Sequence, residues 1–94
     1  MTRRTIRAVR LHPEDDVAVV LEAASPGDVI VLGEETVVVQ DPVPRFHKVA
    51  VRDLEEGSPV RKAGEVIGAA SRPVRRGQHV HIHNLRSLRS AGAR

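Results

Sequence analysis

The chain has 94 residues, no cysteine and a single aromatic residue outside its five histidines, so its core must be aliphatic and rich in valine. A chain of this length buries roughly two-thirds of its unfolded surface, enough for one domain over residues 1–94. The lack of cysteine excludes disulfides and cysteine zinc sites. No apolar run approaches the ~20 residues of a membrane helix, and no signal-peptide core follows the N-terminus. We therefore expect a soluble cytoplasmic protein without membrane contact.

The net charge of +3 is unevenly distributed. Seven arginines lie in residues 3–10 and 86–94, whereas all twelve acidic residues lie between positions 11 and 85, together with only eight lysines and arginines. The folded body is therefore acidic, and it lacks the aromatic residues on which bases stack. We expect no nucleic-acid partner, and we expect residues 1–4 and 86–94 to be flexible tails.

Turn signals recur along the chain. Gly33-Glu34-Glu35 is predicted to be a hairpin loop, and Asp41-Pro42-Val43-Pro44 is predicted to be a loop because proline cannot donate to a strand ladder. Glycine supplies the positive φ that tight turns require. It lies midway between two apolar residues in three heptapeptides, each predicted to be a turn that leads into a strand: Ala24–Ile30, Leu54–Val60 and Val74–Val80.

The valine-rich segments between these turns favour strands, and their spacing is typical of an all-β domain. Pro13–Ala24 is ambiguous, because Pro13 with the acids after it resembles a helix start. A strand is favoured there, after at most a short helical turn at 13–17, and Asp15-Asp16 and Glu55-Glu56 are interpreted as solvated turn acids. The predicted strands are Thr5–Leu11, Val17–Leu21, Val29–Leu32, Thr36–Gln40, His47–Asp53, Val60–Arg61, Val66–Ala69 and His79–His83.

Two basic segments in the middle of the chain are candidates for binding anions. Phe46-His47-Lys48 follows the proline-rich loop, and a His-Lys pair there can hold a carboxylate or phosphate; the alternative is an exposed basic pair. Lys62 and Glu65 flank the turn glycine Gly64 and can pair with each other. The context of a phosphate-binding loop is missing, so a turn with a bulge is the favoured interpretation of this second segment.

The most unusual segment is His79-Val80-His81-Ile82-His83-Asn84. In an extended strand, Val80 and Ile82 would point inward and the three imidazoles would line one outer face. Imidazoles carry protons near neutral pH and bind divalent metals. Outer residues of such a strand lie ~13 Å apart, so we predict a metal or substrate site on a pair, His79/His81 or His81/His83, with His79, His81 and His83 as candidate ligands. The alternative is a polar sheet face with solvated histidines.

Four segments in order give the chain a specific resemblance. They are His12-Pro13 with Asp16-Val17-Ala18-Val19; Pro44 with His47-Lys48-Val49-Ala50-Val51-Arg52-Asp53-Leu54 and Gly57; Val60, Lys62 and Gly64-Glu65-Val66-Ile67-Gly68; and His81-x-His83-Asn84-Leu85. Over residues 6–86 the chain resembles the small N-terminal SAF domain of the altronate and galactarate dehydratase family. The resemblance implies a β-clip fold.

The resemblance also implies a reaction and a partner. The family's reaction is β-elimination from a sugar acid or similar hydroxy acid, and the expected partner is a large catalytic subunit that holds most of a divalent metal site (Fe²⁺, Mn²⁺ or Zn²⁺). Residues that match family motifs imply catalytic roles for His81 and His83. They imply substrate binding by His47, Lys48, Asn84, Lys62 and Glu65.

Three hypotheses about function remain open at this point. The leading one is the small subunit of a two-subunit hydroxy-acid lyase, which releases water or, as in sulfolactate sulfo-lyase, sulfite. The second is a stand-alone β-clip module that binds a sugar acid or a divalent metal, and the third is a structural interaction domain. An exposed edge strand in so small a β domain also predicts a covering partner, for which a second copy of the chain is one candidate.

Overall fold

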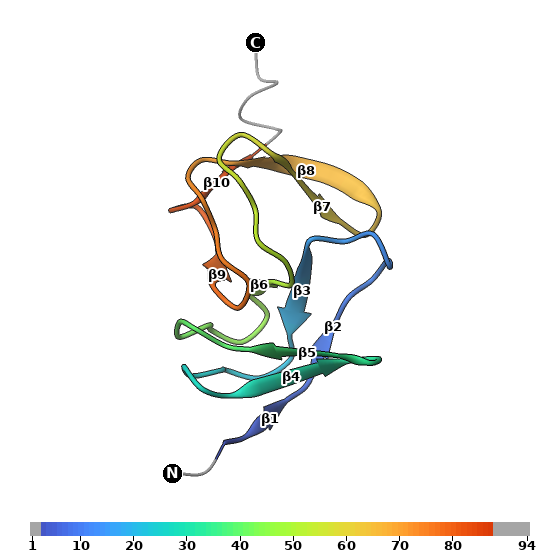
Figure 1. Cartoon of the computed structure of the whole chain (residues 1–94), viewed down its shortest axis with the longest axis vertical. Coiled ribbons are helices and arrows are strands. Elements are labelled where there is room, and N and C mark those ends of the chain that lie inside the picture. The colour runs from blue at the N-terminus through green and yellow to red at the C-terminus, as the bar shows by residue number, and fades with distance from the viewer. Residues whose placement is uncertain (1–2, 88–94) are drawn as a thin grey trace.

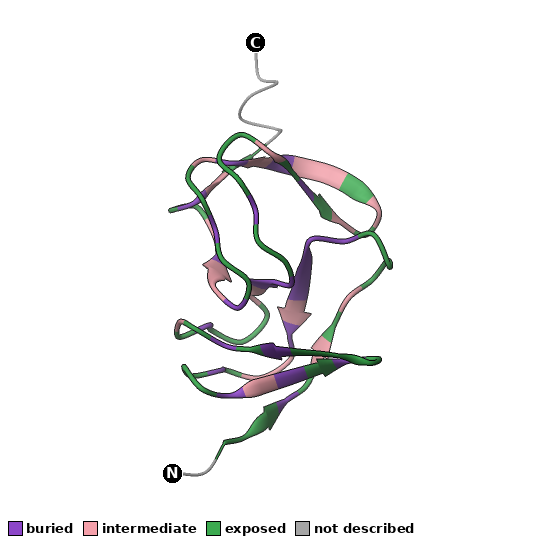
Figure 2. Ribbon diagram, in the orientation of Figure 1, coloured by how far each residue is buried: buried purple, intermediate pink, exposed green. Residues whose placement is uncertain are grey.

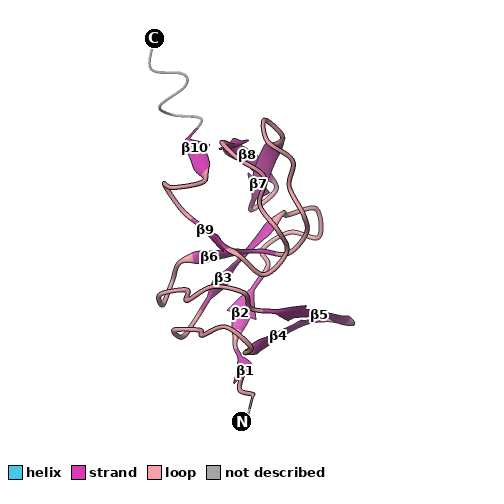
Figure 3. Ribbon diagram, turned by 60° about the vertical axis from the view of Figure 1, so that its left-hand side comes forward, coloured by secondary structure: helices cyan, strands magenta, loops and turns pink. Residues whose placement is uncertain are grey.

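A computed structural model of the protein describes residues 3–87, and these residues form strands, turns and loops without a helix (Figure 3). No segment in this range is therefore a helix long enough to cross a membrane. The predicted all-β fold is confirmed. The ten strands are β1 (Thr5–Ile6), β2 (Ala8–Val9), β3 (Val17–Val20), β4 (Val29–Leu32), β5 (Glu35–Val38), β6 (Lys48–Ala50), β7 (Pro59–Lys62), β8 (Glu65–Ala70), β9 (His79–Val80) and β10 (Leu85–Ser87).

The strands form three small sheets. One sheet has the order β1-β4-β5, another β10-β8-β7, and the third β2-β3-β6-β9. β1 and β4 are parallel, and all the other pairs are antiparallel. The β4–β5 and β7–β8 hairpins lie at opposite ends of the molecule, with β3, β6 and β9 between them (Figure 1).

Consecutive residues of the central strands are buried, Val17 and Ala18 in β3 and Val49 and Ala50 in β6, which explains the adjacent apolar residues in both (Figure 2). Ala18 and Val20 of β3 pack into a core cluster with the β4–β5 hairpin, while Val17 packs into a second cluster with β7, β8 and β9. β6 divides in the same way, with Val49 in the first cluster and Ala50 in the second. This central pair therefore holds the two ends of the molecule together.

The three predicted glycine turns are present, and the structure adds a fourth of the same kind. Gly27, Gly57 and Gly77 have φ of 95°, 85° and 93°, and Phe46 takes the matching place in Val43–Val49 with φ 71°. At each turn this residue donates its backbone N–H to a carbonyl distant in sequence, which lies in a strand for Phe46, Gly57 and Gly77 and just after β5 for Gly27. The sequence pattern missed the fourth copy because an aromatic residue stands where glycine is expected.

Several strand boundaries differ from the prediction. Thr5–Leu11 is interrupted at Arg7, whose backbone N–H donates to the Glu22 carboxylate instead of to a strand. Arg86 and Ser87, which belong to the predicted flexible tail at 86–94, form β10 together with Leu85 and pair with Ala69 and Gly68 of β8. The backbone oxygen of Arg86 occupies the place of a Cβ at Gly68, so the close pairing depends on that glycine. Residues 1–2 and 88–94 lie outside the described range.

The interpretation of Asp15 and Asp16 as solvated acids is wrong. Asp15 is fully buried, and its carboxylate accepts backbone N–H groups from His12, Ala63 and Gly64 at 2.7–3.1 Å. Asp16 accepts the Arg61 N–H at 2.8 Å. Pro13 and Glu14 form a single turn and not a helix. Asp15 and Asp16, which follow this turn, connect the segment before β3 to the β7–β8 hairpin through their hydrogen bonds.

Candidate functional site

A histidine cluster forms where β6 and β9 pair. In this antiparallel ladder Val49 lies opposite His79 and Lys48 lies opposite Val80. Continuing the register by one residue places His47 opposite His81. Side chains two residues apart share a face, and opposite residues lie close together. The ladder therefore brings His47, from a loop end, onto the same face as His79 and His81.

The three imidazoles are close enough to act on one atom. Nδ1 of His47 lies 2.9 Å from Nε2 of His79, and the His47 and His81 rings stack with centroids 4.4 Å apart. One ring nitrogen from each of His47, His79 and His81 lies within 4.8 Å of the other two. We call these three residues the histidine cluster.

The prediction that 79–83 is extended is wrong beyond Val80. The chain turns at residues 81–84, where the Asn84 N–H donates to the His81 carbonyl at 3.0 Å. Ile82, expected to point inward, is 85% exposed. The turn exists because the buried Asn84 amide accepts the His81 N–H and donates to the His79 carbonyl, at 2.9 and 2.8 Å.

The turn changes the role of His83. Its ring returns toward His79, with centroids 5.3 Å apart, but it is exposed and lies outside the cluster of close ligand atoms. His47, rather than His83, has a ring nitrogen close to those of His79 and His81, and metal binding by His79, His81 and His83 stays a prediction. The third close imidazole, His47, is brought to the cluster by the register of β6 and β9 and not by the turn at residues 81–84.

Electrostatic surroundings favour the neutral form of two imidazoles of this cluster, those of His79 and His81. Burial lowers the pKa of His79, and the neighbouring His47, His83 and His81 lower it further, whereas Asp41 raises it. Burial likewise lowers the pKa of His81, assisted by His47, Lys48 and His83. A neutral imidazole has a free lone pair, so these side chains are suited to accept a proton or to bind a metal near neutral pH.

Lys48 adds positive charge beside the cluster, because its charge helps to lower the pKa of His81. Burial lowers the pKa of Lys48, and the charge of Lys62 lowers it further, so the two ammonium groups lie near each other. Within residues 3–87 neither lysine has an ion-pair partner. Lys62 and Glu65 face each other across the turn of the β7–β8 hairpin. This paired lysine charge can attract a carboxylate, whereas Glu65 is exposed at the end of the hairpin.

The residues of the histidine cluster fit a divalent metal. Metal–imidazole bonds are ~2.0–2.1 Å long, so the ligand nitrogens of one ion lie a few ångströms apart, as they do here. His47, His79 and His81 would hold the ion, leaving further positions open to substrate or to groups from another chain. Such an ion would place a concentrated positive charge at the cluster.

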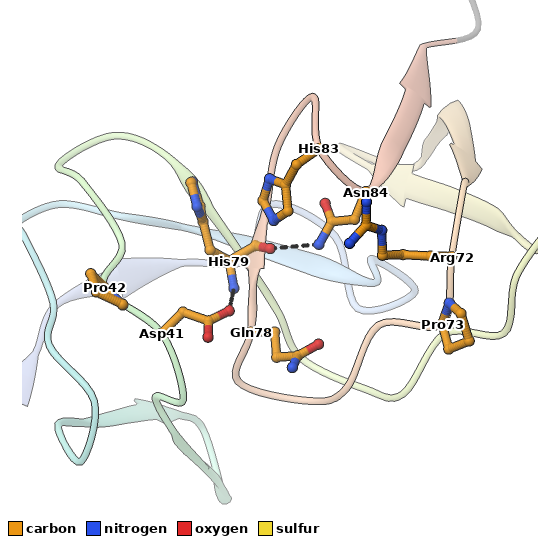
Figure 4. A pocket seen from close by; sticks show the side chains of 8 residues that line it. All are labelled: Asp41, Pro42, Arg72, Pro73, Gln78, His79, His83 and Asn84. Atoms are coloured by element: carbon orange, nitrogen blue, oxygen red, sulfur yellow. Dashed lines mark hydrogen bonds between the residues drawn. The ribbon is translucent and has the colours of Figure 1, made fainter.

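A pocket of about 420 Å³ opens beside the histidine cluster and shares His79 with it (Figure 4). The turn residues His83 and Asn84 form part of its wall. Arg72 and Asp41, which also line the pocket, belong to no sequence motif that predicts a site. Asp41 accepts the His79 N–H at 2.9 Å, a contact between residues 38 positions apart that no local pattern predicts. The lining is Asp41, Pro42, Arg72, Pro73, Gln78, His79, His83 and Asn84.

The fold and site together define a small all-β domain that presents clustered histidines beside a polar pocket. The family model of the altronate/galactarate dehydratase SAF domain matches residues 6–88. The chain belongs to this family, as the resemblance implied.

Relatives place the same domain in two settings. The chain is 37% identical over 79 residues to altronate dehydratase of Escherichia coli K12 and 29% identical over 79 residues to that of Bacillus subtilis 168. In both cases the aligned region covers 84% of this chain and 16% of the relative. It is 34% identical over 87 residues to the (2R)-sulfolactate sulfo-lyase subunit alpha of Chromohalobacter salexigens, spanning 93% of that protein. The domain thus occurs within long chains and as nearly an entire subunit.

Proposed function

We propose that this chain is the small subunit of a two-subunit lyase that carries out β-elimination on a hydroxy acid. The observation that supports this most strongly is the cluster of His47, His79 and His81 on a domain that matches almost the whole of a lyase alpha subunit. In the altronate dehydratases most of the chain lies outside the matched region. A separate large subunit would supply that remainder.

The elimination needs one proton removed from the α carbon and one proton delivered to the group that leaves the β carbon. The C–H bond α to the carboxylate breaks, its electrons form a C=C bond, and the C–O bond at the β carbon breaks. The departing hydroxide takes a proton and leaves as water, and the enol product tautomerises to a keto acid. Such a step requires a base, an acid and positive charge near the enediolate.

The described side chains can meet part of this requirement. His81 has a lowered pKa, so its neutral imidazole can accept the α-proton. His83 is exposed at the edge of the pocket, where it can protonate the leaving group. Lys48, with Lys62 near it, supplies positive charge for the developing enediolate, and Asn84 positions the backbone of His81 and of His79 through its hydrogen bonds to them.

The surface around the cluster supports a protein partner. Phe46 and Ile82, each adjacent in sequence to a clustered histidine, are 60% and 85% exposed. Large exposed apolar side chains beside a polar site are typical of an interface. We propose that the large subunit covers both and thereby closes the histidines into its active site. Ile82→Ser should then weaken association, measured by calorimetry, whereas exposed Val31→Ser on β4 should not.

Reconstitution tests the proposal. The chain would be mixed with a large altronate/galactarate dehydratase or sulfo-lyase subunit from the same genome, and keto-acid, water-loss or sulfite formation followed with altronate, galactarate and (2R)-sulfolactate. We expect turnover only with the chain present, and at least ~10²-fold slower turnover with His81→Ala or His83→Ala. His12→Gln is the matched control, because His12 is exposed and lies outside the cluster. Unchanged turnover in both alanine variants would remove these residues from the chemistry.

The close packing of three imidazoles also favours a second candidate, a stand-alone module that binds a divalent metal. Calorimetric titration of the isolated chain with Zn²⁺, Mn²⁺ or Fe²⁺ discriminates between the two. Micromolar binding that is lost in His47→Ala and His81→Ala but retained in His83→Ala supports metal binding by the chain itself. Absence of heat with all three metals removes this candidate and leaves the lyase proposal intact.

A further inference from the structure

The pocket beside the histidine cluster has opposite charges on its two sides. Arg72 lies on one side with His83 and Asn84, and Asp41 lies on the other (Figure 4). The Asn84 amide already forms hydrogen bonds with the backbone of His81 and His79, so its role in the pocket is structural. The pocket therefore combines a cationic side with an anionic side within about 420 Å³.

The cationic side has unused hydrogen-bonding groups. Across residues 3–87 the Arg72 guanidinium makes no hydrogen bond or ion pair, unlike Arg75, which pairs with Asp53 at 3.8 Å. The His83 imidazole also has no hydrogen-bond partner in the described part of the chain. A guanidinium presents a planar fork of donors that matches a carboxylate. An incoming carboxylate would thus find free donors on this side.

The anionic side would reject a second carboxylate close by but can bind hydroxyls. Oδ2 of Asp41 accepts the His79 N–H, and this bond fixes the carboxylate at the pocket wall. The other oxygen has no hydrogen-bond donor among the described residues. Carboxylate oxygens accept hydrogen bonds only, so they select groups that donate, such as hydroxyls.

We propose that Arg72 binds the carboxylate of a polyhydroxy acid in this pocket and that Asp41 accepts hydrogen bonds from its hydroxyls. The volume lies at the small end of the range for ligand pockets, which fits a small metabolite. His79, between the two sides, belongs to the histidine cluster as well, so a bound acid reaches the proposed catalytic groups. This assignment of positioning residues deepens the proposed lyase function and rests on it for the identity of the substrate.

Titration of the ¹⁵N-labelled full chain followed by NMR tests the assignment without any partner. The probes are galactarate, which has carboxylates and hydroxyls; adipate, which has the carboxylates alone; and galactitol, which has the hydroxyls alone. We expect galactarate to shift the amide signals around Arg72, His83 and Asp41, adipate to bind more weakly, and galactitol not to bind at millimolar concentration.

Variants separate the two sides of the pocket. Arg72→Gln should weaken galactarate binding about ten-fold or more, because a bidentate charged contact is lost, and Arg72→Lys should fall between it and the native chain. Asp41→Asn should lower the affinity for galactarate toward that for adipate, because the carboxylate that accepts hydrogen bonds from the hydroxyls is lost. Arg61→Gln, which removes an exposed guanidinium on β7, is the matched control.

Two results overturn the assignment: no amide shift with galactarate at tens of millimolar, or equal affinity in native chain and Arg72→Gln. Either could occur while reconstituted turnover still depends on His81, which would leave the lyase proposal standing. Conversely, Arg72-dependent galactarate binding without turnover in any reconstitution would uphold the pocket assignment and reject the lyase proposal.

Discussion

Phe46 is one of two non-glycine residues within the described range that have a positive φ, the other being Ala63. Phe46 has φ 71°, where the three matching turns have glycine, and its ring is 60% exposed with the Arg45 guanidinium 4.4 Å from its centroid. A left-handed conformation costs a non-glycine residue ~1–2 kcal/mol. Because the ring adds no core contact, this cost implies a role outside folding, which fits the proposed interface.

Replacing Phe46 separates stability from association. Phe46→Gly should raise the free energy of unfolding by ~0.5–1 kcal/mol, since relief of backbone strain exceeds the entropy cost of glycine. It should at the same time weaken binding of the large subunit. Urea unfolding and calorimetry measure the two effects, with Phe46→Ala as the control that removes the ring but keeps the strain. Loss of stability in Phe46→Gly would contradict the strain argument.

The histidines give the fold a pH dependence of definite sign. The pKa of His79 and of His81 is lowered from the ordinary 6.5, so the unfolded chain binds more protons than the folded one just below that pH. Stability should therefore fall as the pH drops from 6.5 through the lowered values. Urea unfolding between about pH 7 and about pH 5 measures this loss of unfolding free energy. Asp15 does not contribute in that range, because its pKa is lowered from 3.8. A His79→Gln/His81→Gln variant should show a flatter profile, and equal slopes would contradict the assignment.

At the scale of elements, Asp15 links the segment before β3 to the turn of the β7–β8 hairpin. Burial raises the pKa of its carboxyl, but hydrogen bonds from Gly64, Ala63 and His12 outweigh this and hold the pKa below its usual value. The ionised carboxylate is thus the form that fits the fold.

Neutralising Asp15 should loosen this connection. Asp15→Asn should cost ~1.5–3 kcal/mol of unfolding free energy, the usual worth of hydrogen bonds to a charged group. The exposed neighbour change Glu14→Gln should have almost no effect. Urea unfolding compares the two, and a native-like midpoint for Asp15→Asn would show that the three contacts contribute little. On acidification, the native chain should lose this contribution only below the ordinary pKa of 3.8.

Which elements were predictable depends on the range of the interactions that form them. β4 matches the expected Val29–Leu32, and β3 matches Val17–Leu21 to within one residue, because local valine content and turn residues define them. β10 exists through pairing with β8, and the 81–84 turn exists through the Asn84 side chain. Neither has a local periodic signal, so both were missed.

The site divides in the same way. Local spacing found His79 and His81 as neighbours, but His47 joins them only through the register of β6 and β9. Arg72 and Asp41 meet in one pocket although they are distant in sequence, and Asp15 is buried by contacts up to 49 positions away. The sequence around an isolated charged residue in a loop does not indicate which distant residues it will contact.

On the scale of the whole molecule, the histidine cluster lies on the central sheet, with a hairpin at each end (Figure 1). β3 and β6 serve both core clusters, so the position of the histidines is coupled to packing at both ends. This domain provides a rigid support for a few reactive side chains. The remaining catalytic groups are proposed to come from the large subunit.

The most direct test is the rate of keto-acid formation from a hydroxy acid by the large subunit, measured without the chain, with the native chain and with His81→Ala. The account predicts turnover with the native chain, at least ~10²-fold less with His81→Ala, and none above background without the chain. An equal rate in all three reactions would contradict it.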